Sequence, residues 1–158
     1  MAKYDIPATE FDIAGAGVGI IAARFNFHIV DRLLDGALST LADHGVAETQ
    51  LSVLRVPGAF ELPQAALRLG ALDNIAAVIT LGCIIRGGTP HFDYVCSQAA
   101  RGVGDAALRL NKPVIFGVLT TDDQPQAQAR AGGEEGNKGV EAALAALEMI
   151  SLYRRADL

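Results

Sequence analysis

Four short apolar segments alternate along the chain with longer segments whose apolar residues recur at helical spacing. The apolar segments cover residues 18–23, 51–56, 76–85 and 114–119. This alternation is typical of βαβ units, in which successive strands run parallel and helices cover the sheet. The third segment is apolar throughout, as expected of a central strand covered on both faces. The sequence therefore predicts an α/β fold with a four-stranded parallel sheet flanked by helices on both faces.

The predicted helices fill the intervals between these strands. The first has apolar residues from Ile29 to Leu41 at helical spacing and ends at His44-Gly45, because glycine is common just after a helix. The second has Pro63 in its first turn, where proline is favoured. The remaining segments are helices at 92–110, 124–130 and 140–153, a Gly-rich break at 132–139 and an irregular N-terminal segment at 1–16. Without a linker or repeat, a single domain over residues 1–158 is expected.

Composition and charge exclude several kinds of partner. The 158 residues carry a net charge of −5 with no basic run, whereas nucleic-acid binding needs clustered Lys and Arg. The N-terminus leads into no apolar signal core, and the longest apolar run, residues 75–85, is too short to span a bilayer. The two cysteines, Cys83 and Cys96, lie in apolar surroundings and do not suggest a disulfide framework. A cytoplasmic protein with neither nucleic-acid nor membrane partners is expected.

The chain is also poor in charge for its size. Charged residues make up 20% and hydrophobic residues 51% of the chain, against about 25% charged residues in an average soluble domain. An oligomer that covers part of each subunit's surface would explain this composition. An alanine-rich helical surface would explain it equally well, and composition alone leaves both interpretations open.

The unusual residues of the sequence follow the predicted strands. In open parallel sheets, ligands bind at the carboxyl ends of the strands. The segments that follow the four strands are Arg24-Phe25-Asn26, residues 57–61, residues 86–91 and residues 120–123. A ligand site is therefore expected at this edge of the sheet.

The loop Arg86-Gly87-Gly88-Thr89-Pro90-His91 is the most suggestive of these segments. Paired glycines let the backbone approach a ligand, and the helix N-terminus that follows attracts an anion. A phosphate cradle is thus one interpretation, and a tight connection is the other. His91 follows at once and can transfer protons near neutral pH. By position alone it can equally be a helix-capping or solvent-facing histidine.

Other side chains have two interpretations each. Phe25 can offer a face to a planar ring or belong to the core. Glu61 can accept hydrogen bonds from hydroxyls or complement a helix dipole. Arg130 and Lys138 can reach a phosphate or remain solvated, and Arg86 can hold an anion or pin its loop. No spacing of His or Cys suggests a metal site.

Five segments of the chain resemble the motifs of lumazine synthases. They are residues 23–26 (ARFN), 56–63 (VPGAFELP), 81–95 (LGCIIRGGTPHFDYV), 116–120 (FGVLT) and 130–139, where RAG at 130–132 is followed by GNKG at 136–139. They occur in the order of that family and cover nearly the whole chain beyond residue 17.

The resemblance implies a fold and an activity. The fold is a three-layer flavodoxin-like sandwich, in keeping with the predicted parallel sheet. The activity is the penultimate step of riboflavin biosynthesis. In it 5-amino-6-(D-ribitylamino)uracil condenses with 3,4-dihydroxy-2-butanone 4-phosphate to 6,7-dimethyl-8-ribityllumazine, with release of phosphate and water. No metal and no organic cofactor is implied.

The resemblance also implies roles for individual residues. His91 would transfer protons and Phe25 would stack on the pyrimidine. The other implied contacts are to the ribityl chain (Asn26, Ala59, Phe60 and Glu61), to the uracil edge (the backbone of Cys83, Ile84 and Ile85) and to the phosphate (Gly88, Thr89 and Arg130). In this family the site lies between subunits of a pentamer, so Phe116, Arg130 and Lys138 would come from the adjacent chain.

Assembly beyond the pentamer is suggested by the segment before residues 136–139. It carries no insertion, which is typical of family members that close twelve pentamers into an icosahedral shell of sixty chains, and association with riboflavin synthase is a further expected partnership. Four positions depart from the family pattern. Cys83 stands where Thr is expected, Pro90 where a small residue is common, and Glu134-Glu135 in place of Lys-Ala, which removes a positive charge near the phosphate.

Two rival functions fit the same resemblance. The chain can be a non-catalytic carrier of flavin or lumazine, or a homologue that only forms a shell. A carrier needs no proton-transfer residue, so the presence of both His91 and Arg130 favours the enzyme.

Overall fold

The computed structural model describes residues 10–158 and has a four-stranded parallel sheet at its centre. The strands are β1 (Gly17–Ala23), β2 (Leu51–Val56), β3 (Ile75–Ile85) and β4 (Val114–Thr121), in the order β2-β1-β3-β4. All three pairings are parallel, as alternating strands and helices require. The predicted α/β fold class is confirmed.

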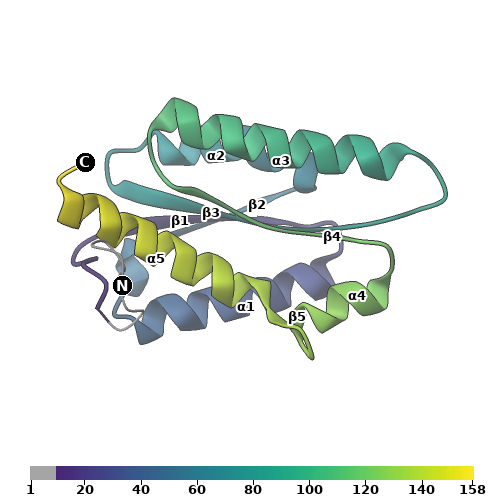
Figure 1. Ribbon diagram of the computed structural model, residues 1–158, viewed down its shortest axis with the longest axis horizontal. Helices are drawn as coiled ribbons and strands as arrows, with labels where there is room; N and C mark the ends of the chain where they lie inside the picture. The colour runs from purple at the N-terminus through teal and green to yellow at the C-terminus, as the bar shows by residue number, and fades with distance from the viewer. Residues whose placement is uncertain (1–9) are drawn as a thin grey trace.

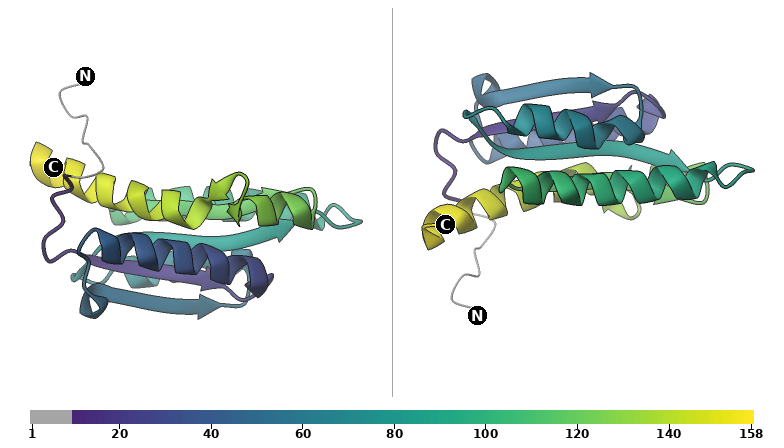
Figure 2. Two further views of the ribbon diagram at one scale, coloured as in Figure 1. Left: turned by 90° about the horizontal axis from the view of Figure 1, so that it is seen from below. Right: turned by 90° about the horizontal axis from the view of Figure 1, so that it is seen from above.

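Helices cover both faces of the sheet (Figure 1). On one face lie α1 (Phe27–Asp43) and α5 (Lys138–Ala156), and on the other lie α2 (Leu62–Gly70) and α3 (His91–Leu110). Three short helical segments complete the chain: η1 (Glu48–Gln50), η2 (Ala59–Glu61) and α4 (Gln124–Ala129). The two edge strands of the sheet are β2 and β4. Figure 2 shows that β2 is the edge farther from α5.

The core is divided into two layers by the sheet. Ile20 and Leu81 pack with α1 and α5 in one layer, whereas Ile21 and Val78 pack with α2 and α3 in the other. Successive side chains of a strand point to opposite faces, so both faces of β1 and β3 need apolar residues. This requirement explains why residues 75–85 are apolar except for Thr80, whose buried hydroxyl donates to Ile115 O at 2.8 Å.

A close approach between α1 and α5 fixes the start of α5. A Cβ at Gly139 would lie 1.9 Å from the carbonyl oxygen of Leu33, so only glycine fits there. Asn137 caps α5 by accepting a hydrogen bond from Gly139 N at 2.8 Å, and its Nδ2 donates to Arg32 O at 3.0 Å. Asn137 thereby holds the start of α5, where Lys138 is the first residue, against α1.

The structure corrects several predicted boundaries. The predicted Gly-rich break at 132–139 contains a small antiparallel hairpin of β5 (Ala131–Gly133) and β6 (Gly136–Asn137) and the first turn of α5. Gly132 and Gly136 have φ of 95° and 77°, values that glycine adopts without strain. Strand β4 also runs two residues further than predicted, to Thr121.

Two further predictions concern the N-terminal segment and membrane-spanning helices. Residues 10–16 contain no helix or strand, as predicted for the irregular segment 1–16, of which residues 1–9 lie outside the described part. Within residues 10–158, the helices lack the combination of length and apolar character that crossing a bilayer would require.

Candidate active site

A cleft opens at the carboxyl ends of β1 and β3, beside η2 and the first turns of α3. Its volume of about 690 Å³ falls within the range of about 300–1,000 Å³ typical of small-molecule sites. The residues that line it are Phe25, Pro57, Gly58, Ala59, Phe60, Glu61, Cys83, Ile84, Ile85, Gly87, Thr89, His91, Phe92 and Val95. Segments that follow three different strands therefore meet in one place, as predicted for this edge of the sheet.

Most of the predicted site residues line this cleft, but five do not. The five are Asn26, Gly88, Phe116, Arg130 and Lys138. Asn26 and Gly88 are next to lining residues in the sequence. The other three belong to β4 and to the two ends of the β5–β6 hairpin. The single chain thus brings together only part of the predicted set.

Phe25 supplies an exposed aromatic face. Its side chain is 71% exposed although it directly follows a fully buried strand. The backbone of Arg24 and Phe25 continues the pairing with the β2 end through hydrogen bonds of 2.8 Å to Val56 O and 3.0 Å to Pro57 O. These bonds hold the ring at the cleft, so the interpretation of Phe25 as a core residue is wrong.

Asn26 connects the end of β1 to the end of β3, next to the cleft residue Phe25. It adopts a left-handed conformation with φ of 58°, which asparagine tolerates better than most residues. Its Nδ2 donates a hydrogen bond to the carbonyl oxygen of Cys83 at 2.9 Å. Part of the Asn26 amide is therefore committed to the protein, and its oxygen remains for a ligand.

Cys83 presents its backbone rather than a reactive thiol to the site. The side chain is 3% exposed, and burial raises the pKa of the thiol to about 11. The thiol is therefore protonated at neutral pH, when only a thiolate is an effective nucleophile. The sequence departure at this position adds no nucleophile to the cleft.

Glu61 contributes a carboxylate that is partly engaged. One oxygen, Oε2, accepts a hydrogen bond from Gly58 N at 3.0 Å and holds the turn of η2. This contact gives Glu61 a local structural role that differs from the predicted interaction with a helix dipole. Its second oxygen forms no hydrogen bond with residues 10–158, and it lies in a cleft wall where a hydroxyl donor can reach it.

The loop between β3 and α3 leaves backbone donors free. Among the described residues, none accepts a hydrogen bond from the N–H groups of Gly87, Gly88 or Thr89. A Cβ at Gly87 or Gly88 would meet nothing within 4 Å. Packing within the chain therefore does not require glycine at these two positions. A ligand that approaches the loop backbone closely would require it, because a side chain would stand in its way. Free N–H groups before a helix N-terminus favour an anion.

His91 is the first residue of α3 and faces the cleft beside this loop. The residue before α3 is Pro90, and no side chain caps the helix. Within the described part of the chain, no residue forms a hydrogen bond with the His91 ring. The capping interpretation is therefore wrong, whereas His91 is exposed, as the solvent-facing interpretation predicts.

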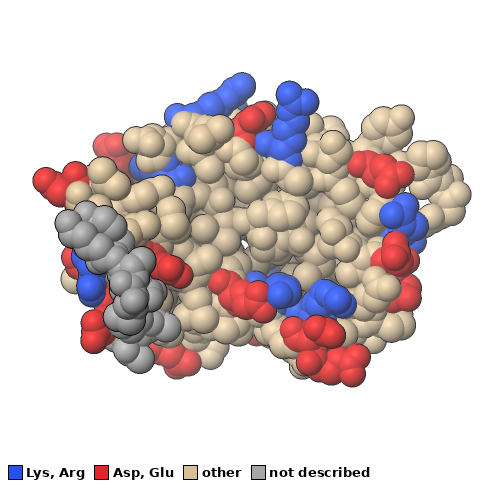
Figure 3. Space-filling view, viewed as in Figure 1, with Lys and Arg blue, Asp and Glu red and all other residues tan. Residues whose placement is uncertain are grey.

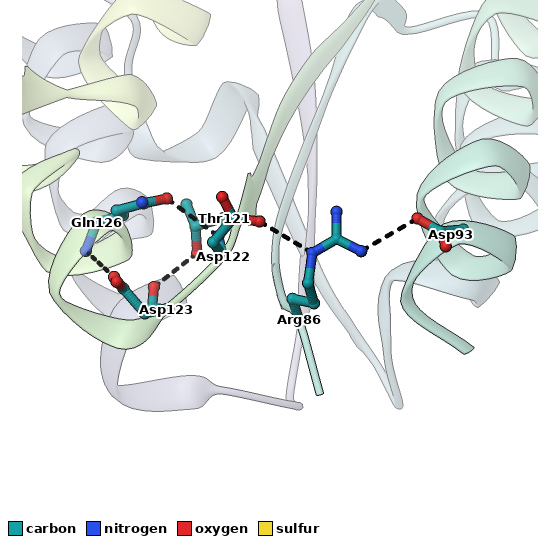
Figure 4. A network of polar contacts seen from close by, with 6 residues as sticks. All are labelled: Arg86, Asp93, Thr121, Asp122, Asp123 and Gln126. Carbon is teal, nitrogen blue, oxygen red and sulfur yellow. Dashed lines mark hydrogen bonds and ion pairs between the residues drawn. The ribbon is translucent and has the colours of Figure 1, made fainter. Parts of the chain in front are cut away.

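Arg86 pins the loop from its amino end. Its Nε donates to Asp122 Oδ1 at 2.9 Å, and its Nη1 lies 3.4 Å from Asp93 Oδ1 (Figure 4). The guanidinium carbon lies 4.2 Å from the centre of the Phe92 ring. The hydrogen bond that Arg86 donates to Asp122, together with the charges of both carboxylates, raises the pKa of Arg86. Arg86 does not line the cleft.

Arg130 and Lys138 lie together at the base of the β5–β6 hairpin. The backbone N–H of Lys138 donates to Arg130 O at 2.9 Å. The side chain of Arg130 donates to Gln126 O at 3.0 Å, and Lys138 pairs with Glu141 at 2.8 Å. The hairpin thus produces a local pair of cations, outside the cleft of the same chain.

Phe92 and Val95 are cleft residues that the sequence analysis did not single out. They are three positions apart in α3, so they lie on the same side of the helix. Helical spacing from His91 is the signal that would have found them. For residues 10–158, no three His, Cys, Asp or Glu side chains are grouped so that they could hold a metal ion.

Comparisons with known proteins agree on one family. The profile of the family described as 6,7-dimethyl-8-ribityllumazine synthase matches residues 15–154. A 6,7-dimethyl-8-ribityllumazine synthase of Aquifex aeolicus (strain VF5) is 48% identical over 140 residues, which are 89% of this chain and 91% of the relative. The enzyme of the same name from Desulfovibrio desulfuricans (strain ATCC 27774 / DSM 6949 / MB) is 49% identical over 148 residues, 94% and 95% of the two chains.

Proposed function

This chain belongs to the 6,7-dimethyl-8-ribityllumazine synthase family, an enzyme family of riboflavin biosynthesis, and we propose how its cleft performs the condensation. The substrates are 5-amino-6-(D-ribitylamino)uracil and 3,4-dihydroxy-2-butanone 4-phosphate. The observation that carries the proposal is the meeting of an exposed aromatic face, free loop amides and an unpaired imidazole in one cleft.

The uracil ring stacks on Phe25 and meets the end of β3. A planar ring gains from an exposed aromatic face, and the polar edge of a pyrimidine needs hydrogen-bonding groups beside that face. The backbone of Cys83, Ile84 and Ile85 provides these groups. Asn26 and the segment Ala59-Phe60-Glu61 hold the hydroxyls of the ribityl chain, for which the free carboxylate oxygen of Glu61 is an acceptor.

The phosphate of the second substrate binds at Gly88 and Thr89. The free N–H groups of this loop and the N-terminus of α3 both favour negative charge. The same groups stabilise phosphate as it leaves, so the loop serves binding and catalysis. Much of the rate comes from holding two substrates in line, since orientation can supply up to about 7–11 kcal/mol of a barrier.

His91 transfers protons between the two bound substrates. The amine attacks the ketone and water leaves to form an imine, after which phosphate is eliminated and an enol forms. The second nitrogen then closes the ring with loss of water. Each step moves a proton, and an imidazole can serve as acid in one step and as base in another.

A neighbouring chain completes the site. Phe116, Arg130 and Lys138 do not line the cleft of their own chain, so we assign them to the cleft of an adjacent subunit in a pentamer. The face that includes α3, β4 and α5 is poor in charge at its centre, with charged side chains along its margin (Figure 3). Phe116 is exposed on β4, an edge strand with free backbone groups.

We also propose a larger assembly and a cytoplasmic location for this protein. A hairpin without an insertion before Lys138 favours the icosahedral shell of twelve pentamers, and riboflavin synthase is a candidate partner of such a shell. Both cysteines are free thiols, which suits a reducing cytoplasm.

One assay tests the enzyme against the carrier and the purely structural shell protein. The purified protein is mixed with both substrates, and formation of the lumazine is followed by absorbance and fluorescence. The enzyme gives a rate well above that of the substrates alone. A rate equal to the uncatalysed one would leave only a carrier or a shell protein.

A further inference from the structure

Arg86 spans the loop that holds the free N–H groups. It is the last residue before Gly87, and its guanidinium reaches the two residues that follow His91. It lies 4.2 Å from the centre of the Phe92 ring and 3.4 Å from Asp93 Oδ1. The side chain thereby closes a ring around residues 87–91.

A third contact ties this ring to the neighbouring strand. Arg86 Nε donates to Asp122 Oδ1 at 2.9 Å, and Arg86 N donates to Thr121 O at 2.9 Å. Asp122 is itself held, since its N–H donates to Gln126 Oε1 at 3.0 Å at the start of α4 (Figure 4). Arg86 therefore joins the first turn of α3 to the first turn of α4.

Little else in the described chain fixes this loop. The N–H groups of Gly87, Gly88 and Thr89 have no acceptor among residues 10–158, and space is open around both glycines. Glycine has the largest conformational freedom of all residues, so an untethered loop of this kind would sample many arrangements. Only some of these would direct the three N–H groups at one anion.

The contacts of Arg86 are too exposed to matter much for global folding. The side chains of Arg86, Asp93 and Asp122 are 47%, 65% and 67% exposed, and exposed ion pairs contribute little to stability because solvent screens them. Their effect is local order at the loop. Phe92 lines the cleft and follows His91, so the same contacts also fix the position of the imidazole.

We propose that Arg86 is a positioning residue whose contacts with Phe92, Asp93 and Asp122 form a clasp that orders the phosphate loop and His91. Arg86 is not a ligand of the phosphate, because its guanidinium is engaged by two carboxylates and does not line the cleft. The inference rests on the proposed function and adds to it the device that keeps the anion site assembled.

Removing the acidic partners separates the clasp from a direct phosphate ligand. The double variant Asp93→Ala/Asp122→Ala keeps Arg86 and removes two carboxylates, which makes the net charge near the loop more positive by two units. A direct ligand released from its carboxylates would bind inorganic phosphate more tightly. The clasp predicts weaker binding of inorganic phosphate, by about tenfold, because displacing a site by about 1 Å can cost up to about 100-fold. Binding is measured calorimetrically on the intact assembly.

Substitutions of Arg86 provide the second arm. Arg86→Met should raise KM for the phospho-sugar and lower kcat, each by about tenfold, since the loop and His91 move together. Arg86→Lys keeps the charge but not the planar fork that meets two carboxylates and stacks on a ring. The clasp predicts that it resembles Arg86→Met, whereas a role of charge alone predicts wild-type behaviour.

Two controls make the result decisive. Arg68→Met removes an exposed cation on α2 that has no partner among the described residues, and its phosphate binding and kinetics should match the wild type. Thermal unfolding of all variants should be unchanged. Tighter phosphate binding by the acidic double variant, or wild-type kinetics of Arg86→Lys, would overturn the clasp. An inactive wild-type protein would instead contradict the proposed function.

Discussion

At the level of single residues, His91 and Arg130 are expected to affect different kinetic constants. His91→Ala should lower kcat by about 100-fold or more, because general acid-base groups contribute about 10²–10⁴-fold. Arg130→Ala should chiefly raise KM for the phospho-sugar, since it removes a charge-assisted contact to phosphate. Steady-state kinetics with each substrate varied in turn will separate the two. If both variants change the same constant to the same extent, the assignment of their roles is wrong.

Cys83 makes the stability of the protein depend on alkaline pH. Burial raises the pKa of its thiol from 9.0 to about 11, so between these values the unfolded chain loses the proton while the folded chain keeps it. The free energy of unfolding should therefore fall as pH rises from 9 to 11.

The matched variant is Cys83→Thr, the residue that the family pattern favours. Denaturant unfolding at pH 8, 9, 10 and 11 should show a smaller loss of stability in this variant than in the wild type. Equal losses in both proteins would mean that Cys83 is not the group responsible.

At the level of elements, the strands and helices were predictable where burial alone determines them. The bounds of β2 agree with the prediction residue for residue, and those of β3 differ by one residue. Strand β3 was predictable because a strand covered on both faces is almost wholly apolar. Strand β2 lies at the edge of the sheet, and its end was predictable from Pro57-Gly58. The β5–β6 hairpin was not predictable in this way. It has two very short strands and depends on the positive φ of Gly132 and Gly136, not on an apolar pattern.

The site was predictable only in part, for a related reason. Positions after strands predicted that Phe25, Glu61 and His91 lie near one another, since all carboxyl ends of a parallel sheet meet at one edge, and all three line the cleft. Contacts between distant residues leave no such signal. The hydrogen bond between Arg86 and Asp122 joins residues 36 positions apart in the sequence. The hydrogen bond from Asn26 to the carbonyl oxygen of Cys83 joins residues 57 positions apart.

The carboxyl end of α2 is joined to the turn before β4 by Lys112, and this contact can be tested by substitution. Lys112, in the turn before β4, donates hydrogen bonds to Gly70 O at 2.8 Å and Leu72 O at 3.0 Å. A cation that satisfies carbonyls at a helix end stabilises it. Lys112→Met should lower the free energy of unfolding by about 1–2 kcal/mol.

Arg109→Met is the control for this variant, because it removes a nearby exposed cation without a described partner. It should change the unfolding free energy by less than about 0.5 kcal/mol. Urea denaturation of both variants beside the wild type measures the difference. Equal effects would show that charge in the region matters and that the Lys112 hydrogen bonds do not.

At the level of the whole molecule, the sheet separates two groups of functional residues. The cleft opens beside η2 and α3, whereas the cations of the β5–β6 hairpin lie next to α1 and α5. Within one chain His91, proposed for proton transfer, and the two cations proposed for phosphate binding therefore lie in different places. A chain on its own should be nearly inactive, and a pentamer should join the two groups at each subunit boundary.

Mixed assemblies test this shared site most directly. His91→Ala and Arg130→Ala chains, each with its own tag, are co-expressed, and oligomers that carry both tags are purified before lumazine formation is measured. Random pairing returns intact His91 and Arg130 to about a quarter of the sites. At phospho-sugar concentrations well below the KM of Arg130→Ala, each variant alone is nearly inactive, so the mixture should have about a quarter of the wild-type rate. A mixture no more active than the mean of the two single variants would contradict a site built from two chains.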